Sequence, residues 1–145
     1  MSIWKTRKKY LLAELKPKLS DIGFEPVGTC ITGGRTTATH VEFERHQKTT
    51  FDSLTIVFDK YWRPKYYLSF RRRKLVPPYE IIMSAHLSRR KGKMTDWWGA
   101  HWYSLDKEKA WKLSIEKVGK MLGQVDVFLN SGQDGKNITD MSEYF

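Results

Sequence analysis

The sequence predicts an α+β protein, in which an N-terminal and a C-terminal helix pack on one face of an antiparallel meander of about five strands. Apolar residues recur every three or four positions near both ends of the chain, as in amphipathic helices, and every two positions in between, as in strands. Aromatic residues make up 14% of the chain, which favours a sheet because large flat side chains pack well on its surface. With 145 residues the chain has the length of one domain, so we expect residues 1–145 to form a single unit.

The first helix is expected over residues 3–22. Apolar side chains from Trp4 to Ile22 fall near helical spacing, and most of the lysines lie away from that stripe. Pro17 lies inside the pattern and predicts a kink or the start of a second short helix, because proline lacks the amide hydrogen that a helix interior uses. Gly23 occupies the usual position of a left-handed cap and ends the helix.

The strands follow from Val27 onward, where the apolar period changes to two. Gly33-Gly34 is a hairpin signal between the first two strands, and Pro77-Pro78 breaks the chain before the fifth. The expected strands are 27–32, 35–46, 51–59, 65–73 and 80–88, with a further short strand at 101–105.

The second helix is expected to begin after Asp106, a plausible N-cap. Apolar residues then recur at intervals of three and four to about Asn130, and Gly132 ends the helix. The polar segment 133–145 is expected to be a loosely ordered tail.

Positive charge is concentrated in one internal stretch. The chain carries a formal net charge of +10, and residues 60–93 hold eleven Lys and Arg against one acid, Glu80, so this stretch accounts for the whole excess. A localised positive region attracts anions more strongly than an evenly basic surface does. We therefore expect these residues to mark a surface for an acidic partner.

Two arginine runs and nearby aromatic residues make up the expected binding surface. Arginine binds phosphate and carboxylate through two parallel hydrogen bonds, and aromatic rings offer stacking surfaces. The competing interpretation is a solvated strand face beside a flexible basic loop. The candidate binding residues are Lys65, Tyr67, Arg71, Arg72, Arg73, Lys74, Arg89, Arg90, Lys91, Lys93, Trp97 and Trp98. For the three tryptophans between 97 and 102, both core packing and an exposed binding platform are open.

The order of these elements suggests a family. A first helix ending in LSDIGF (Leu19 to Phe24), a meander, and Trp97-Trp98 before an amphipathic helix resemble an uncharacterised group of small bacterial α+β domains of unknown function. Some similar proteins are immunity partners of secreted toxins, so the resemblance implies a protein-binding role. The basic stretch 60–93 departs from that family, and no residue role is carried over from it.

His40, Glu42, Glu44 and His46 alternate along one expected strand, so their side chains share a face. Imidazoles and carboxylates are metal ligands. However, each strand residue rises about 3.3 Å, so the four side chains spread over ~20 Å and one ion cannot reach them all. A wet strand face is the simpler interpretation, and we expect neither a metal nor another cofactor.

His86 and His101 are the candidate acid–base residues, with Asp96 near the second. A general base needs an orienting partner and a group that stabilises developing charge, and nothing at fixed spacing supplies these. The single cysteine, Cys30, is expected to be a buried strand residue. It suits a reducing compartment, and no apolar run is long enough to span a membrane, so we expect a cytoplasmic protein.

Three functions follow, in order of preference. The first is a non-enzymatic binding protein of the inhibitor or immunity type, which docks its basic, aromatic surface onto an acidic protein. The alternative is a module that binds RNA or single-stranded DNA through the same surface. The third is a small metal-independent nuclease-like enzyme.

Overall fold

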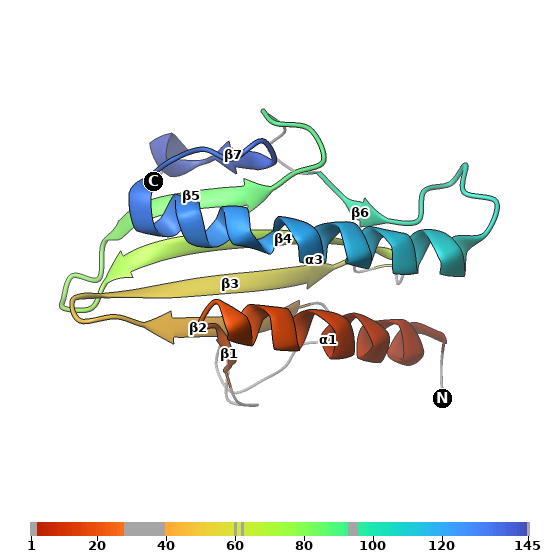
Figure 1. The fold of residues 1–145 in the computed structure, drawn as a ribbon, viewed down its shortest axis with the longest axis horizontal. Coiled ribbons are helices and arrows are strands. Elements are labelled where there is room, and N and C mark those ends of the chain that lie inside the picture. Colours follow the sequence, from red (N-terminus) through yellow and green to blue (C-terminus); the bar gives the residue numbers. More distant parts are fainter. Residues whose placement is uncertain (1–2, 28–39, 60, 62, 93–95, 145) are drawn as a thin grey trace.

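The chain folds into an antiparallel sheet with two long helices on one of its faces (Figure 1). The structure is a computed structural model that describes residues 3–27, 40–59, 61, 63–92 and 96–144. The α+β class and the meander order are therefore confirmed. Within the described residues the sheet has seven strands rather than about five: four of the expected strands and three short ones, while the expected strand 27–32 lies largely outside these residues.

The helices are α1 (Ile3–Asp21) and α3 (Lys107–Ser131), and a short 3₁₀ turn, η1 (Ser142–Tyr144), follows later. The strands lie in the order β1-β2-β3-β4-β5-β7. Strand β6 pairs with the first two residues of β4, which β5 does not reach. Their bounds are β1 Glu25–Pro26, β2 His40–His46, β3 Thr50–Phe58, β4 Lys65–Lys74, β5 Ile81–Leu87, β6 Trp98–Gly99 and β7 Ile138–Asp140.

Both helices begin and end close to the expected residues. Helix α1 runs through Pro17 as one helix, and Gly23 follows it with a φ of +91°. The side chain of Asp106 accepts a hydrogen bond from the Lys109 amide at 3.0 Å and so caps the start of α3. Gly132 ends α3 with a φ of +73°, and its amide donates to the Phe128 carbonyl at 2.7 Å.

The core lies between the helices and the sheet. Alternate residues of the central strands point toward the helices and are fully buried, including Leu54 and Ile56 of β3 and Tyr66 and Leu68 of β4. They meet the buried stripe of α3, where the Tyr66 ring packs edge-on against Trp111 with centroids 5.1 Å apart. The expected alternation of β3 and β4 is thus confirmed.

The expected strand at 101–105 is instead a turn, and the strand lies earlier, at β6. The Ser104 amide donates to the His101 carbonyl and the His101 amide donates to Ser104 Oγ, both at 3.0 Å, which closes the turn. Gly99 pairs with Lys65 at a φ of +111°, and a Cβ atom there would lie 2.2 Å from the Pro64 carbonyl oxygen. Only glycine allows β6 to approach β4 this closely.

The segment expected to be a loose tail contains β7, which pairs with β5. Ile138 is buried in the core, and the side-chain amide of Asn137 donates to the Ser88 carbonyl at 2.9 Å. The Met141 amide donates to the Ser84 carbonyl at 2.7 Å. These contacts hold the segment against the sheet. The expected hairpin around Gly33-Gly34, together with Cys30, lies largely outside the described residues.

Candidate functional site

Much of the positive charge of residues 60–93 is matched by carboxylates. Among the described residues, five of its cations form ion pairs, and four of the partner acids come from outside the stretch. A carboxylate beside a cation weakens the field that the cation projects into solvent. The stretch is therefore less positive in space than in sequence. The pairs are Arg63–Asp59, Arg72–Asp52, Lys74–Glu80, Arg89–Asp96 and Lys91–Asp134.

The candidate binding residues separate into two groups along β4. Because β5 runs antiparallel to β4, Arg89 and Arg90, which follow β5, lie near the start of β4 with Lys65 and Tyr67. The run Arg71 to Lys74 lies toward the other end, about 20–30 Å from Lys65 at ~3.3 Å per residue. One continuous basic patch does not form from them. Lys93 lies outside the described residues.

Arg72 differs most from its expected place, because it faces the helices. Its Nε and Nη2 donate to the two carboxylate oxygens of Asp52 at 2.7 and 3.0 Å, and Nη2 also donates to Asn130 Oδ1 at 3.1 Å. Asp52 is completely buried, and a buried carboxylate needs such partners. Arg72 therefore neutralises a buried carboxylate and is not part of an exposed binding surface.

The sheet face turned away from the helices carries the other outward residues of β4. Tyr67 lies edge-on to Trp97 with ring centroids 4.9 Å apart, and its ring also lies 5.7 Å from that of His86. Burial, and then the charge of Arg73, lowers the pKa of Arg71, while Glu42 opposes that shift. Acids and bases are therefore mixed on this face.

The four metal candidates of β2 lie along this face but do not converge. No group of three or more possible ligands gathers anywhere in the part of the chain that the structure describes. His46 Nε2 lies 3.3 Å from Glu44 Oε1, and the His46 ring stacks on Phe51 with centroids 5.9 Å apart. His40 and Glu42 complete the alternating row.

The tryptophans divide between core and surface. Trp98 is buried, and its indole N–H donates to the Leu87 carbonyl at 3.0 Å, so it does not offer the exposed binding surface expected of it. Trp97 is half-buried. Trp102 and Tyr103 are exposed over 87% and 62% of their surface, and Leu105 is fully exposed. We call residues 101–105 the aromatic loop.

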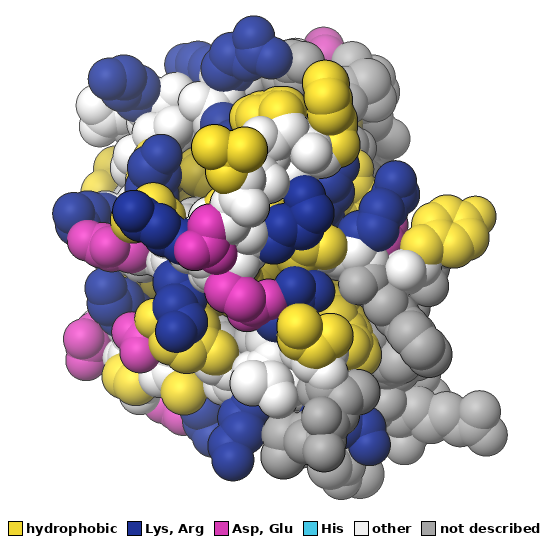
Figure 2. Space-filling view, turned by 90° about the vertical axis from the view of Figure 1, so that its right-hand side faces the viewer, with side chains coloured by type: hydrophobic (Ala, Val, Ile, Leu, Met, Phe, Trp, Pro, Cys, Tyr) yellow, Lys and Arg dark blue, Asp and Glu magenta, His cyan; other side chains and the backbone are white. Residues whose placement is uncertain are grey.

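The aromatic loop lies at the end of the molecule where α1 and α3 begin (Figure 1). Figure 2 faces this end and shows hydrophobic side chains among those of Lys and Arg. Ile3 and Tyr61 are also exposed here, and Lys107 Nζ donates to the His101 carbonyl at 3.0 Å. Large exposed apolar groups of this kind mark interaction surfaces. The sequence signal for it was the HWYSL run directly before the N-cap of α3.

A cavity of about 620 Å³ lies beneath the aromatic loop, against α3. Polar groups on its wall include Arg89, His101 and Lys117, and Trp98 and Met121 contribute apolar surface. None of the described residues that line it is Asp or Glu. Two of the candidate binding residues, Arg89 and Trp98, and the candidate base His101 therefore meet in one place.

Arg89 is held in this cavity by two neighbours. Its Nε and Nη2 lie 3.0 and 2.9 Å from Asp96 Oδ1, and its Nη1 lies 2.6 Å from His101 Nε2. Burial raises the pKa of Asp96, but hydrogen bonds from Arg89 and from the Arg90 amide outweigh this and lower it overall. The ionised carboxylate of Asp96 therefore binds Arg89 and does not orient the His101 ring through a hydrogen bond.

His101 is poorly placed to act as a base. Burial, and then the charges of Arg89 and Lys65, lower its pKa, so the ring is neutral at pH 7. Because arginine has only donors, the close Arg89 contact makes Nε2 the acceptor nitrogen. The lone pair that a general base needs is thus already used. His86, on the opposite sheet face, lies beside Tyr67.

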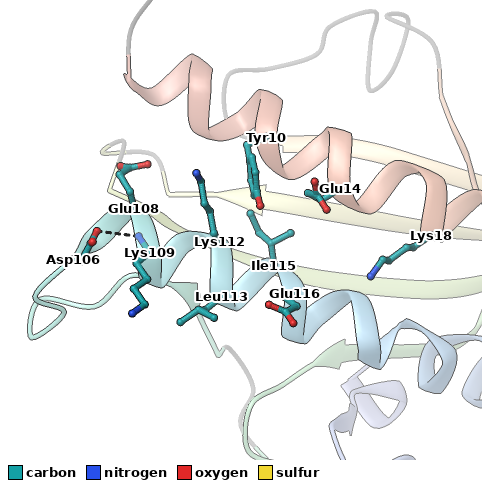
Figure 3. A pocket seen from close by; sticks show the side chains of 10 residues that line it. All are labelled: Tyr10, Glu14, Lys18, Asp106, Glu108, Lys109, Lys112, Leu113, Ile115 and Glu116. Carbon is teal, nitrogen blue, oxygen red and sulfur yellow. Dashed lines mark hydrogen bonds between the residues drawn. The ribbon is translucent and has the colours of Figure 1, made fainter.

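A second cavity, of about 510 Å³, lies between α1 and α3 (Figure 3). Glu14 and Lys18 project from α1 toward α3, Lys112 projects from α3 toward α1, and Glu116 of α3 also lines the groove. Lys112 Nζ also lies 5.1 Å from the centre of the Tyr10 ring. Acids and bases alternate around this groove, so it favours neither sign of ligand charge.

No protein-family model, curated protein or solved structure matches this chain. Among the described residues, no helix combines the length and the apolar character needed to cross a membrane.

Proposed function

We propose that this protein is a binding protein of the inhibitor or immunity type, which docks the end carrying the aromatic loop onto an acidic protein. One observation carries the proposal: Trp102 is 87% exposed beside the exposed Tyr103 and Leu105. Exposing such side chains to water is unfavourable unless a partner covers them. Trp and Tyr are also the residues that most often dominate the affinity of protein interfaces.

The charge around the loop indicates the chemistry of the partner. Arg90, Lys107 and Lys117 are exposed near it, and none of them forms an ion pair within the described part of the chain. Cations at the rim of an interface attract an acidic surface and speed up association. The resemblance to small bacterial α+β domains of unknown function, some of them similar to toxin-immunity proteins, is part of this proposal.

Binding is favoured over catalysis because His101, the candidate base that lines the cavity, is not free to accept a proton through Nε2. His101 uses Nε2 to accept a hydrogen bond from Arg89, and Asp96 is turned toward that same arginine. A protein partner is favoured over nucleic acid because three of the cations expected to contact phosphate are instead paired with carboxylates. These cations are Arg72, Lys74 and Lys91.

The test is affinity capture from nuclease-treated lysate of the source cell, followed by binding measurements on the purified partner. The variant Trp102→Ala/Tyr103→Ala removes the exposed rings, and Val76→Ala/Val127→Ala removes exposed apolar side chains elsewhere. We expect an acidic partner whose affinity falls at least about tenfold with the first variant and is unchanged with the second. Rising salt should slow its association.

Two results would overturn the proposal. One is equal affinity of both variants for the captured partner, since the aromatic loop would then play no part. The other is capture that disappears with nuclease treatment, together with binding of mixed-sequence single-stranded RNA or DNA that weakens steeply with salt. The second result would establish the nucleic-acid function instead.

A further inference from the structure

We propose that the cavity beneath the aromatic loop binds a small organic acid, with the carboxylate on Arg89 and the apolar body against Trp98, Leu113 and Met121. This inference concerns the cavity wall and does not depend on the docking of a protein partner. It starts from the hydrogen-bond donors of Arg89.

Arginine has five N–H groups, and three of those of Arg89 have partners. Nε and one N–H of Nη2 point at Asp96, and one N–H of Nη1 points at His101. Each terminal nitrogen therefore keeps one N–H without a partner among the described residues. These two N–H groups can donate charge-assisted hydrogen bonds to a carboxylate. The Arg89 side chain is 36% exposed, so a ligand can reach it.

The surroundings hold this arginine in a fixed orientation. Asp96 is buried and also accepts the backbone amides of Arg89 and Arg90 at 2.7 and 3.1 Å, so it cannot swing away easily. His101 stacks on Tyr103 with ring centroids 5.1 Å apart. A guanidinium held in place before binding loses less conformational entropy when the ligand arrives.

The charge of the cavity wall favours an anion. Asp96 balances Arg89, and His101 is neutral, so Lys117 supplies the uncompensated positive charge of the wall. Because no described lining residue is acidic, the like charge closest to a carboxylate on Arg89 is that of Asp96, which Arg89 already pairs. The groove between α1 and α3 lacks this preference, since Glu14 and Glu116 line it.

The size and the apolar part of the wall indicate the rest of the ligand. A volume of about 620 Å³ falls in the range of small-molecule pockets, which is ~300–1,000 Å³. Trp98 belongs to the lining but is only 2% exposed, so Leu113, which is 46% exposed, and Met121 provide most of the apolar contact. Met121 adapts to different shapes because its side chain is unbranched. An aromatic or branched aliphatic acid fits this combination.

The test uses phenylacetate and 3-phenylpropionate as probes, with 2-phenylethanol as the uncharged counterpart. Binding is followed at pH 7.5 by the NMR signal of the Trp98 indole N–H and by calorimetry. We expect the acids to shift this signal and to bind at least about tenfold more tightly than the alcohol. Equal affinity of acid and alcohol, or no shift at millimolar acid, would overturn the proposal.

Variants locate the site. Lys117→Glu reverses the charge on the wall, whereas Lys120→Glu makes the same change one turn along α3 at a residue that does not line this cavity. Arg89→Lys keeps a positive partner for Asp96 but loses the paired N–H groups. We expect about tenfold weaker acid binding from Lys117→Glu and from Arg89→Lys, and little change from Lys120→Glu.

Thermal melting shows whether each variant folds. If Arg89→Lys does not fold, the comparison of Lys117→Glu with Lys120→Glu decides the test. If Lys117→Glu and Lys120→Glu bind the acid equally, the site is not in this cavity. Trp102→Ala, at a residue that does not line the cavity, separates the two proposals: weaker binding of the protein partner with retained acid binding would show that the cavity works independently of docking. Retained partner binding with no acid binding would remove the cavity proposal alone.

Discussion

The carboxylate of Asp52 on β3 binds Arg72 on the neighbouring strand β4 through two hydrogen bonds, at 2.7 Å from Nε and 3.0 Å from Nη2. Asp52 also accepts Nε of Arg45, from β2, at 2.7 Å. Arg45 in turn donates through Nη1 to the Ile22 carbonyl at 2.8 Å and to Asp126 of α3. We call this set of residues the charge network; it joins three strands to the C-terminal ends of both helices.

Asp52→Asn should destabilise the protein by about 3–5 kcal/mol. The change leaves two arginines in a largely buried site with one carboxylate fewer, and an uncompensated buried charge is costly. Denaturant unfolding followed by tryptophan fluorescence measures the effect. Asp134→Asn, which removes an exposed ion pair with Lys91, should cost less than about 1 kcal/mol. Similar losses from both changes would contradict the importance of the charge network.

Gly99→Ala and Gly123→Ala should have opposite effects on stability. A Cβ at Gly99 would meet the Pro64 carbonyl oxygen at 2.2 Å, and the φ of +111° disfavours any side chain, so we expect a loss above about 2 kcal/mol. A Cβ at Gly123 would meet nothing within 4 Å on α3, so alanine should add about 0.5–1 kcal/mol. Thermal unfolding of the two variants tests both signs. A stable Gly99→Ala protein would show that β6 does not approach β4 as described.

Trp102→Ala should leave stability within about 0.5 kcal/mol of the wild type, because the ring makes few contacts in the folded chain. Trp111→Ala should cost about 3–5 kcal/mol, because Trp111 is buried against Tyr66 and its indole N–H donates to the Arg7 carbonyl at 3.2 Å. Urea unfolding of each variant separates them. A large loss from Trp102→Ala would mean that this ring packs within the fold rather than waiting for a partner.

His101 should make the protein less stable as the pH falls below neutral. Burial and the charges of Arg89 and Lys65 lower its pKa in the folded state, whereas in the unfolded chain it titrates near ~6.5. Below that pH the unfolded state therefore binds more protons, and stability falls until the lower folded pKa is reached. The free energy of unfolding of wild type and His101→Gln is measured from pH 7.5 to pH 5. The variant should lose less stability over this range, and parallel curves would contradict the prediction.

The sequence was sufficient for the elements whose apolar pattern is long. Helix α3 and strands β3, β4 and β5 all follow from repeated spacing, and Asp106 and Gly132 mark the ends of α3 as expected. Strands β1, β6 and β7 have two or three residues each, too few for a period to be visible. Their pairing depends on contacts distant in sequence, such as that of Asn137 with Ser88.

The candidate site was harder to predict because charge pairing is a property of the fold. Nothing near Arg72 in sequence indicates that Asp52 lies opposite it, and Asp96 reaches Arg89 across a loop. Alternation along β2 placed His40 to His46 on one face correctly, yet the same alternation turns Arg45 into the core. The aromatic loop was visible as a run of aromatic residues, but its exposure depends on the turn that Ser104 closes.

Because of the charge network, the two ends of the molecule differ in how rigidly the helices are held. At the end that holds the network, both helices are tied to the sheet through buried groups, whereas at the other end Arg7 and Glu108 join the helices through a partly exposed pair. We therefore expect the hydrogen-bonded amides in the second turns of α1 and α3 to exchange with solvent sooner than those in their last turns. The surface around the aromatic loop can therefore adjust its shape to a binding partner, while the charge network keeps the C-terminal ends of the two helices in place.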